Sequence, residues 1–254
     1  GTNFTNSLLV GTSSTGTLSS ADGNTGVGVG VFGALTSGDN NVAVGLNALD
    51  VNTTGSENVA VGMGALDTNT TGAGNISIGC GSMSANVSGN YNVAIGRCAL
   101  DTSVSGSSNV AIGDRALYTN TASYNTSVGF FSLAANTTGA SNVAVGTNVL
   151  SANTTASNNT AVGKDSLKAN TTGSENTALG ITSSFSNTTG SCNVALGRNA
   201  LYTTTTGGQN IAIGTAALYS NTTASNNTAV GSNALLANTT GASNVAVGAE
   251  ALDA

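Results

Sequence analysis

The seventeen residues Asn41–Glu57, which read NVAVGLNALDVNTTGSE, are the unit from which nearly the whole chain is built. We number the unit from its first Asn as position one. In every clear copy position one is Asn, position four is aliphatic and position five is Gly. The copies begin at Asn24, Asn41, Asn58, Asn75, Asn92, Asn109, Asn125, Asn142, Asn159, Asn176, Asn193, Asn210, Asn227 and Asn244. Self-similarity at a fixed short period indicates a repeat architecture in which each copy is one structural layer.

The spacing of the copies is 17 residues throughout, except for 16 between Asn109 and Asn125. We therefore expect a single repeat domain over residues 1–254, with a decayed first coil at 7–23, clear repeats at 24–254 and one 16-residue unit at 109–124. The missing residue falls in the polar turn, where a loss is tolerated best. Both ends of the chain lie within a repeat, so we expect the repeat to continue in phase, by head-to-tail stacking into a filament or within a longer repeat.

The opening pentad predicts a short β-strand, because it alternates and is rich in Val, Ile and Thr. Gly at position five permits the backbone bend that follows; examples are Gly45, Gly62, Gly79, Gly96 and Gly113. Leu near position nine suggests a second short strand, and the Asn-Thr-Thr-Gly segment suggests a return turn. The expected fold is all-β: a parallel β-solenoid, or β-roll, of about fifteen 17-residue coils with two short strands per coil.

The Asn at position one has a structural explanation. Stacked coils bring identical residues into columns about 4.8 Å apart, and a column of Asn can form a ladder of side-chain amide hydrogen bonds. We expect this ladder at Asn41, Asn58, Asn75, Asn92, Asn109, Asn142 and Asn159, among others.

Position three is always small although it lies on the strand face opposite positions two and four. We expect positions two and four to point into the core, so that position three points away from it. A freely solvated face would accept larger polar residues, and strictly small ones indicate another backbone packed closely there. That backbone is either a turn of the same coil or, as we favour, a neighbouring chain at Ala43, Ala60, Ala94, Ala111 and Ala144.

Composition excludes several classes of function. Charged residues make up 6% of the chain, and it contains no His, so the usual catalytic triads and imidazole metal sites are missing. The five basic residues are scattered, which argues against a nucleic-acid partner, and no apolar run has the ~20 residues that span a bilayer. We expect no enzyme activity, no cofactor, no metal and no membrane insertion. Charges collect at positions six, seven, ten and seventeen, which we expect to face solvent.

Two kinds of residue are candidates for covalent modification. Cys80 and Cys98 fall in adjacent coils at positions six and seven, within range of a disulfide, whereas Cys192 stands alone. The turn also repeats the N-glycosylation sequon, although such sequons arise automatically in an Asn/Thr repeat. The candidate acceptors include Asn52, Asn69, Asn136, Asn153 and Asn170.

The repeated Asn-Val-Ala-Val-Gly and Asn-Val-Ala-Ile-Gly pentads over residues 24–254 resemble the head repeats of trimeric autotransporter adhesins, and related repeats in phage and viral fibre stems. The resemblance implies a left-handed parallel β-roll that assembles as a homotrimer on a cell or virion surface. This unit is longer than the adhesin head repeat by an Asn-Thr-Thr-type insertion.

We therefore expect an extracellular structural fibre or filament subunit that self-assembles. The alternative is an adhesin or virion tail-fibre stem that binds a glycan or protein on a host surface. An ice-binding protein is the third alternative. Flat solenoids with Thr columns have that architecture, but here the Thr residues are consecutive and do not form two flat columns.

Overall fold

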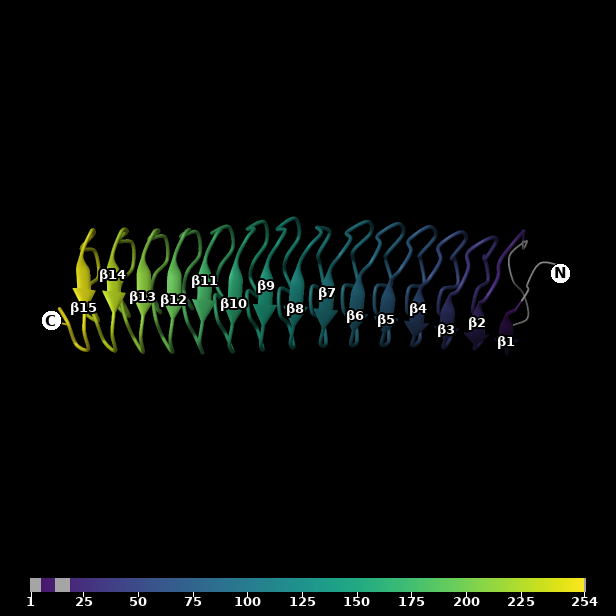
Figure 1. Cartoon of the computed structure of the whole chain (residues 1–254), viewed down its shortest axis with the longest axis horizontal. Helices are drawn as coiled ribbons and strands as arrows, with labels where there is room; N and C mark the ends of the chain where they lie inside the picture. The colour runs from purple at the N-terminus through teal and green to yellow at the C-terminus, as the bar shows by residue number, and fades with distance from the viewer. Residues whose placement is uncertain (1–5, 12–18, 254) are drawn as a thin grey trace. The chain divides into compact units, whose positions relative to one another are not determined.

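The computed structural model describes residues 6–11 and 19–253. The chain forms two compact units, residues 1–125 (unit 1) and 126–254 (unit 2), which are described separately. Within each unit, every coil carries one strand, and successive strands lie side by side in the same direction (Figure 1). The prediction of a single domain over residues 1–254 stays a prediction.

The strands are three residues long and recur with the period of the repeat. Unit 1 holds β1 (Leu8–Val10), β2 (Thr25–Val27), β3 (Val42–Val44), β4 (Val59–Val61), β5 (Ile76–Ile78), β6 (Val93–Ile95) and β7 (Val110–Ile112). Unit 2 holds β8 (Thr126–Val128), β9 (Val143–Val145), β10 (Thr160–Val162), β11 (Thr177–Leu179), β12 (Val194–Leu196), β13 (Ile211–Ile213), β14 (Thr228–Val230) and β15 (Val245–Val247).

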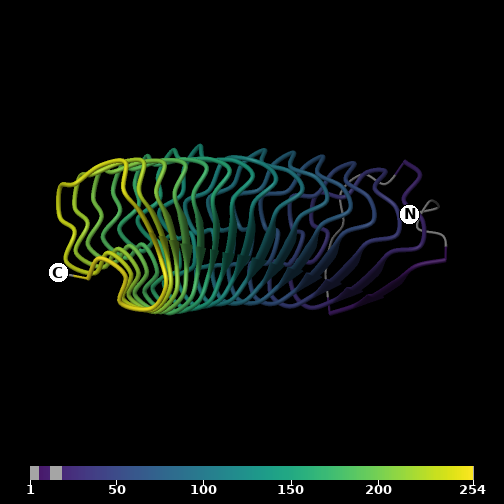
Figure 2. The same cartoon turned by 60° about the vertical axis from the view of Figure 1, so that its left-hand side comes forward.

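Neighbouring strands pair in parallel and in register, so that identical repeat positions lie opposite one another. Ala43 lies opposite Ala60, for example, and Ala178 opposite Ala195. The described residues contain no helix. The predicted all-β parallel solenoid with a 17-residue period is thus confirmed, and Figure 2 shows the coils of each unit following one outline.

The prediction of two strands per coil is wrong, because the Leu-bearing segment forms turns. In the coil that starts at Asn41, Asn47 and Leu49 have φ of 55° and 51°, in the left-handed region. Leu rarely adopts this conformation, which costs about 1–2 kcal/mol. Leu49 is completely buried, and full burial of a Leu side chain contributes about 1.5–3 kcal/mol. Burial therefore outweighs the backbone strain at position nine.

The sides of the strand are also reversed from the prediction. Position three points into the coil, and positions two and four point out. Ala43 and Ala94 have no exposed surface, whereas Val44 and Ile95 each keep 36% of theirs. A Cβ built on Gly26, which occupies position three in β2, would lie 2.8 Å from Val31 and 3.1 Å from Phe32. Position three therefore faces positions eight and nine of its own coil.

The Asn at position one forms a buried ladder inside each unit. Asn41 donates both its backbone N–H and its Nδ2 to Asn24 Oδ1, at 2.9 and 3.0 Å. Asn58 does the same to Asn41, at 3.0 and 3.1 Å. Since these side chains are fully buried, each amide needs partners, and the next coil supplies them.

A second Asn ladder runs through position twelve, where Asn69 Nδ2 donates to Asn52 Oδ1 at 2.8 Å. The carbonyl of position fifteen joins the two ladders, because Gly55 O accepts from both Asn41 (2.9 Å) and Asn52 (2.8 Å). The 16-residue unit keeps this junction: Ala122 O accepts from Asn109 and Asn120. The deletion therefore shortens the turn and keeps the Ala122 junction, while Asn125 Nδ2 donates to Asn120 Oδ1 at 3.2 Å.

The Gly at position five is required on two grounds. Gly45 has φ of 134°, which side chains other than hydrogen rarely allow. A Cβ on Gly45 would also lie 2.5 Å from the carbonyl oxygen of Gly62 in the next coil. The turn prediction at Gly45, Gly62, Gly79, Gly96 and Gly113 agrees with their φ values of 132–140°.

Candidate interaction surface

The outward side of each parallel sheet is a charge-free aliphatic surface, which we call the outward face. It consists of positions two and four of the described strands, and these positions hold only Val, Ile, Leu and Thr. Ile76, Ile78, Ile211 and Ile213 expose 37–39% of their surface. Contiguous apolar surface of this kind on a soluble chain marks an interaction site more often than scattered apolar residues do.

The alanines at position three do not contribute to this surface. Ala43, Ala60, Ala94, Ala111 and Ala144 are fully buried within the chain itself. The prediction that they contact a neighbouring chain is therefore wrong, and the turn of the same coil is the backbone that packs there. Where Ser replaces Ala, its hydroxyl bonds that turn: Ser77 donates to the Ser82 carbonyl at 2.8 Å.

Position six extends the outward face in unit 1. Val29, Leu46 and Met63 occupy this position in three consecutive coils and are 48–64% exposed. Two coils later Arg97 and Asp114 end the apolar run, and Arg97 Nη2 lies 2.8 Å from Asp114 Oδ2. The alternation of the strand continues through Gly at position five, so positions two, four and six share the outward side.

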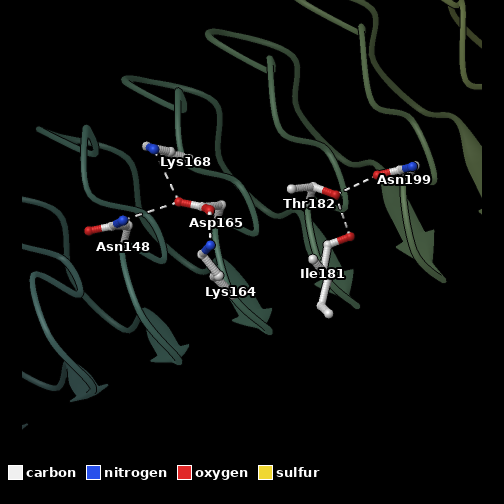
Figure 3. Close-up of polar contacts among 7 residues, drawn as sticks. All are labelled: Asn148, Lys164, Asp165, Lys168, Ile181, Thr182 and Asn199. Carbon is white, nitrogen blue, oxygen red and sulfur yellow. Dashed lines mark hydrogen bonds and ion pairs between the residues drawn. The ribbon is translucent and has the colours of Figure 1, made fainter.

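In unit 2 a polar cluster follows the strand ends (Figure 3). Asp165 accepts hydrogen bonds from Asn148 Nδ2 at 3.2 Å and has Lys168 Nζ at 3.1 Å and Lys164 Nζ at 3.8 Å. Burial alone would raise the pKa of Asp165, but the hydrogen bonds and the two lysine charges outweigh it and hold the pKa below its usual value. The cluster joins one carboxylate to two ammonium groups and carries one net positive charge.

Position ten has different chemistry in the two units. In unit 1 it includes Asp50 and Asp67, and burial, with the charge of Asp50, raises the pKa of Asp67. In unit 2 it includes Phe185, Tyr202 and Tyr219, whose rings stack with centroids 5.2 and 5.1 Å apart and interplanar angles of 8° and 3°. Since the rings cover one another's faces, the stack stabilises adjacent coils and leaves little ring face for a ligand.

The candidate glycosylation sites at Asn52, Asn69, Asn136, Asn153 and Asn170 are wrong for the folded chain. All five are fully buried, and their Nδ2 atoms donate inside the coil. Asn52, for example, donates to Gly55 O, and Asn170 donates to Asn153 Oδ1 at 2.9 Å. A glycan on this nitrogen would break the position-twelve ladder, so the sequons are a by-product of a structural Asn.

The three cysteines are free thiols. Cys98 N donates to the Cys80 carbonyl at 3.0 Å, so the two residues lie in contact across adjacent coils as expected. Burial, followed by the charge of Asp101, raises the pKa of the Cys98 thiol. Cys192 Sγ lies 3.5 Å from Glu175 Oε2.

Within residues 6–11 and 19–253, no group of three or more Cys, Asp or Glu side chains is placed to hold a metal ion. The same residues include no helix that is long and apolar enough to cross a membrane.

No protein-family model matches the chain, and neither the curated proteins nor the solved structures compared with it include a match. The likeness to adhesin heads and fibre stems therefore stays a prediction.

The sequence pattern did not identify the outward face as exposed, although one signal was available. Strand alternation puts positions one and three on one side. If the Asn at position one forms a buried ladder, position three must be buried with it, and positions two and four must face out.

Proposed function

We propose that the chain is a subunit of a structural fibre on a cell or virion surface, in which copies associate laterally through the outward face. The observation that carries this proposal is the charge-free aliphatic surface of positions two and four. In this proposal the chain contributes length and rigidity, without catalysis, and three copies surround one axis as the resemblance implies.

The energetics support a partner for this surface. Unit 1 presents fourteen outward residues, two from each of its seven strands, and specific interfaces use roughly 20–30 residues a side. A third-exposed Val or Ile still has roughly 0.5–1 kcal/mol to gain from complete burial. Twelve of the fourteen are Val or Ile, and their combined gain of roughly 6–12 kcal/mol is comparable to an association cost of about 4–15 kcal/mol.

Charge placement supports a second copy as that partner. The outward strand positions carry no charge in the described residues, while Glu57 and Glu175 at position seventeen border them on one side. Lys164 and Arg198 at position six border them on the other, where unit 1 has the Arg97–Asp114 ion pair. When parallel copies surround an axis, the position-six border of one meets the position-seventeen border of the next, so opposite charges approach.

Sedimentation equilibrium tests the proposal. The wild-type chain is expected to sediment with three times the mass of one chain. The double variant Ile95→Lys/Ile112→Lys should sediment as a single chain with an unchanged circular dichroism spectrum, because two charges then lie on the outward face. Thr54→Lys/Thr71→Lys is the matched control, since both residues are exposed in the return turn of unit 1. A wild-type chain that stays single at high concentration would overturn the proposal.

The alternatives predict other results. An adhesin would bind a glycan array or host cells as an isolated chain. An ice-binding protein would show thermal hysteresis, but the Thr hydroxyls at position thirteen are already engaged: Thr53 Oγ1 donates to Thr70 O at 2.9 Å and Thr171 Oγ1 to Thr188 O at 3.0 Å.

A further inference from the structure

Cys80 and Cys98 are neighbours in space although 17 residues separate them in the chain. The hydrogen bond from Cys98 N to Cys80 O, 3.0 Å long, joins the segments that follow the strands of two adjacent coils. Standard bond lengths then place their Cα atoms roughly 5–6 Å apart, inside the ~4.4–6.8 Å range that disulfides require.

The position of the Cys98 sulfur is also favourable. Cys98 Sγ lies 3.6 Å from a Cβ built on Gly81, the residue next to Cys80. The Cys98 sulfur therefore leans toward the coil that holds Cys80, and Gly81 has no side chain to occupy the space between them. Cys80 is exposed and Cys98 is partly exposed, so a small reagent reaches the pair.

We propose that Cys80 and Cys98 form a modification site. Their two thiols, on neighbouring coils, are oxidised to an intrachain disulfide by a small disulfide such as oxidised glutathione. The inference does not use the outward face or its proposed partner, although Cys80 at position six lies beside that face.

The exchange has two steps. The Cys80 thiolate, having lost its proton to solvent, attacks one sulfur of the reagent and breaks the reagent's S–S bond, so that one glutathione leaves as a thiolate. The Cys98 thiolate then attacks the Cys80 sulfur of the mixed disulfide and expels the second glutathione. The two cysteines are oxidised by two electrons, and the one molecule of oxidised glutathione is reduced to two thiols.

The disulfide would tie two successive coils together. The loop between the cysteines, residues 81–97, includes the strand β6, and closing it restricts the unfolded chain. A chain oxidised in this way should unfold at a temperature several degrees higher than the reduced chain.

Intact-mass spectrometry of the folded full chain after incubation with oxidised glutathione tests this. Wild type and Cys192→Ser should each lose two hydrogen atoms and retain no glutathione at Cys80 or Cys98, and peptide mapping should join the two residues. Cys80→Ser and Cys98→Ser should instead keep a glutathione on the remaining thiol of the pair. The melting temperature should rise on oxidation in Cys192→Ser and stay unchanged in Cys98→Ser.

Two results would overturn the proposal. One is stable glutathione on both Cys80 and Cys98 of the same wild-type chain, which would mean that the sulfurs do not meet. The other is a disulfide between two chains at Cys80 with no internal link.

Discussion

On strand β6, Ala94 and Ile95 are adjacent in the chain and have opposite surroundings. Ala94 is completely buried against its own coil, whereas Ile95 keeps 36% of its surface exposed. The interior holds small residues, Leu and two Asn ladders, while the larger β-branched residues cover the outside. The Asn at position one and the small residue at position three occupy the inward side of each strand, so the aliphatic residues at positions two and four cover the outward side.

Substitutions on the inward side should destabilise the chain much more than substitutions on the outward side. Ala94→Leu adds three carbons to a site with no free space, and we expect a loss of about 3 kcal/mol or more in the free energy of unfolding. Ile95→Thr should change that free energy by less than ~1 kcal/mol in a single chain. Urea unfolding at one low protein concentration measures both. Equal losses in the two variants would contradict the assignment of sides.

The next largest expected loss in the free energy of unfolding comes from the aromatic column at position ten of unit 2. Tyr202→Ser removes two stacked ring pairs, each worth about 0.5–1.5 kcal/mol beyond its buried area, so a loss of ~1–3 kcal/mol is expected. Tyr118→Ser, at the same position of unit 1 and next in its column to Asp101, is the control. Comparable losses at Tyr118 would show that stacking is not the cause.

The position-twelve Asn ladder is interrupted at Thr204, and a single substitution should restore it. Thr204 replaces Asn at position twelve, and Asn187 Oδ1 in the preceding coil is buried without a hydrogen-bond partner. Thr204→Asn supplies a donor to that oxygen and should raise the free energy of unfolding by about 1–2 kcal/mol. Thr206→Asn, on the exposed turn of the same coil, should have little effect. A destabilised Thr204→Asn variant would argue against the ladder as a source of stability.

Replacing Asp67 or Asp165 by Asn should change the free energy of unfolding at pH 7 by small amounts of opposite sign. Because burial and Asp50 raise the pKa of Asp67, ionised Asp67 lowers stability above its folded pKa. Asp67→Asn should therefore stabilise the chain at pH 7, with the gain vanishing as the pH falls below the unfolded value of about 3.9. The pKa of Asp165 is lowered, so Asp165 adds stability above the unfolded value, and that stability is lost as the pH falls through its folded pKa. Asp165→Asn should destabilise at pH 7.

Urea unfolding of both variants at pH 7 and at about pH 2 measures whether each substitution raises or lowers the free energy of unfolding. Shifts of the same sign at pH 7 would show that the two environments do not differ as described.

Much of the fold follows from the repeat itself. The period and the Asn41 ladder follow from comparing copies of the unit, and the strand at Val42–Val44 and the bend at Gly45 follow from its local sequence. The left-handed backbone of Leu49 does not, because Leu disfavours that conformation and only tertiary burial stabilises it. The inward direction of Ala43 could have been derived from Asn41, which shares its side of the strand.

The outward face was harder to predict, because its exposure also depends on the fold of the whole coil. Val42 and Val44 have the composition of a core strand, but the buried Asn41 and Ala43 take the inward side of the same strand, so the two valines face outward. What contacts these outward residues depends on how chains assemble, and a single sequence bears on assembly only through the composition of its surface.

The central claim is that the outward face contacts another copy. A nitroxide spin label at Thr177→Cys, in a chain whose three native cysteines are replaced by Ser, tests it most directly, because Thr177 is exposed at position two of β11 and its replacement removes no aliphatic contact. Thr172→Cys, exposed in the preceding turn, provides the matched label away from the face. The account predicts strong dipolar broadening of the electron paramagnetic resonance spectrum at residue 177 and none at residue 172. Unbroadened spectra at both residues would contradict it.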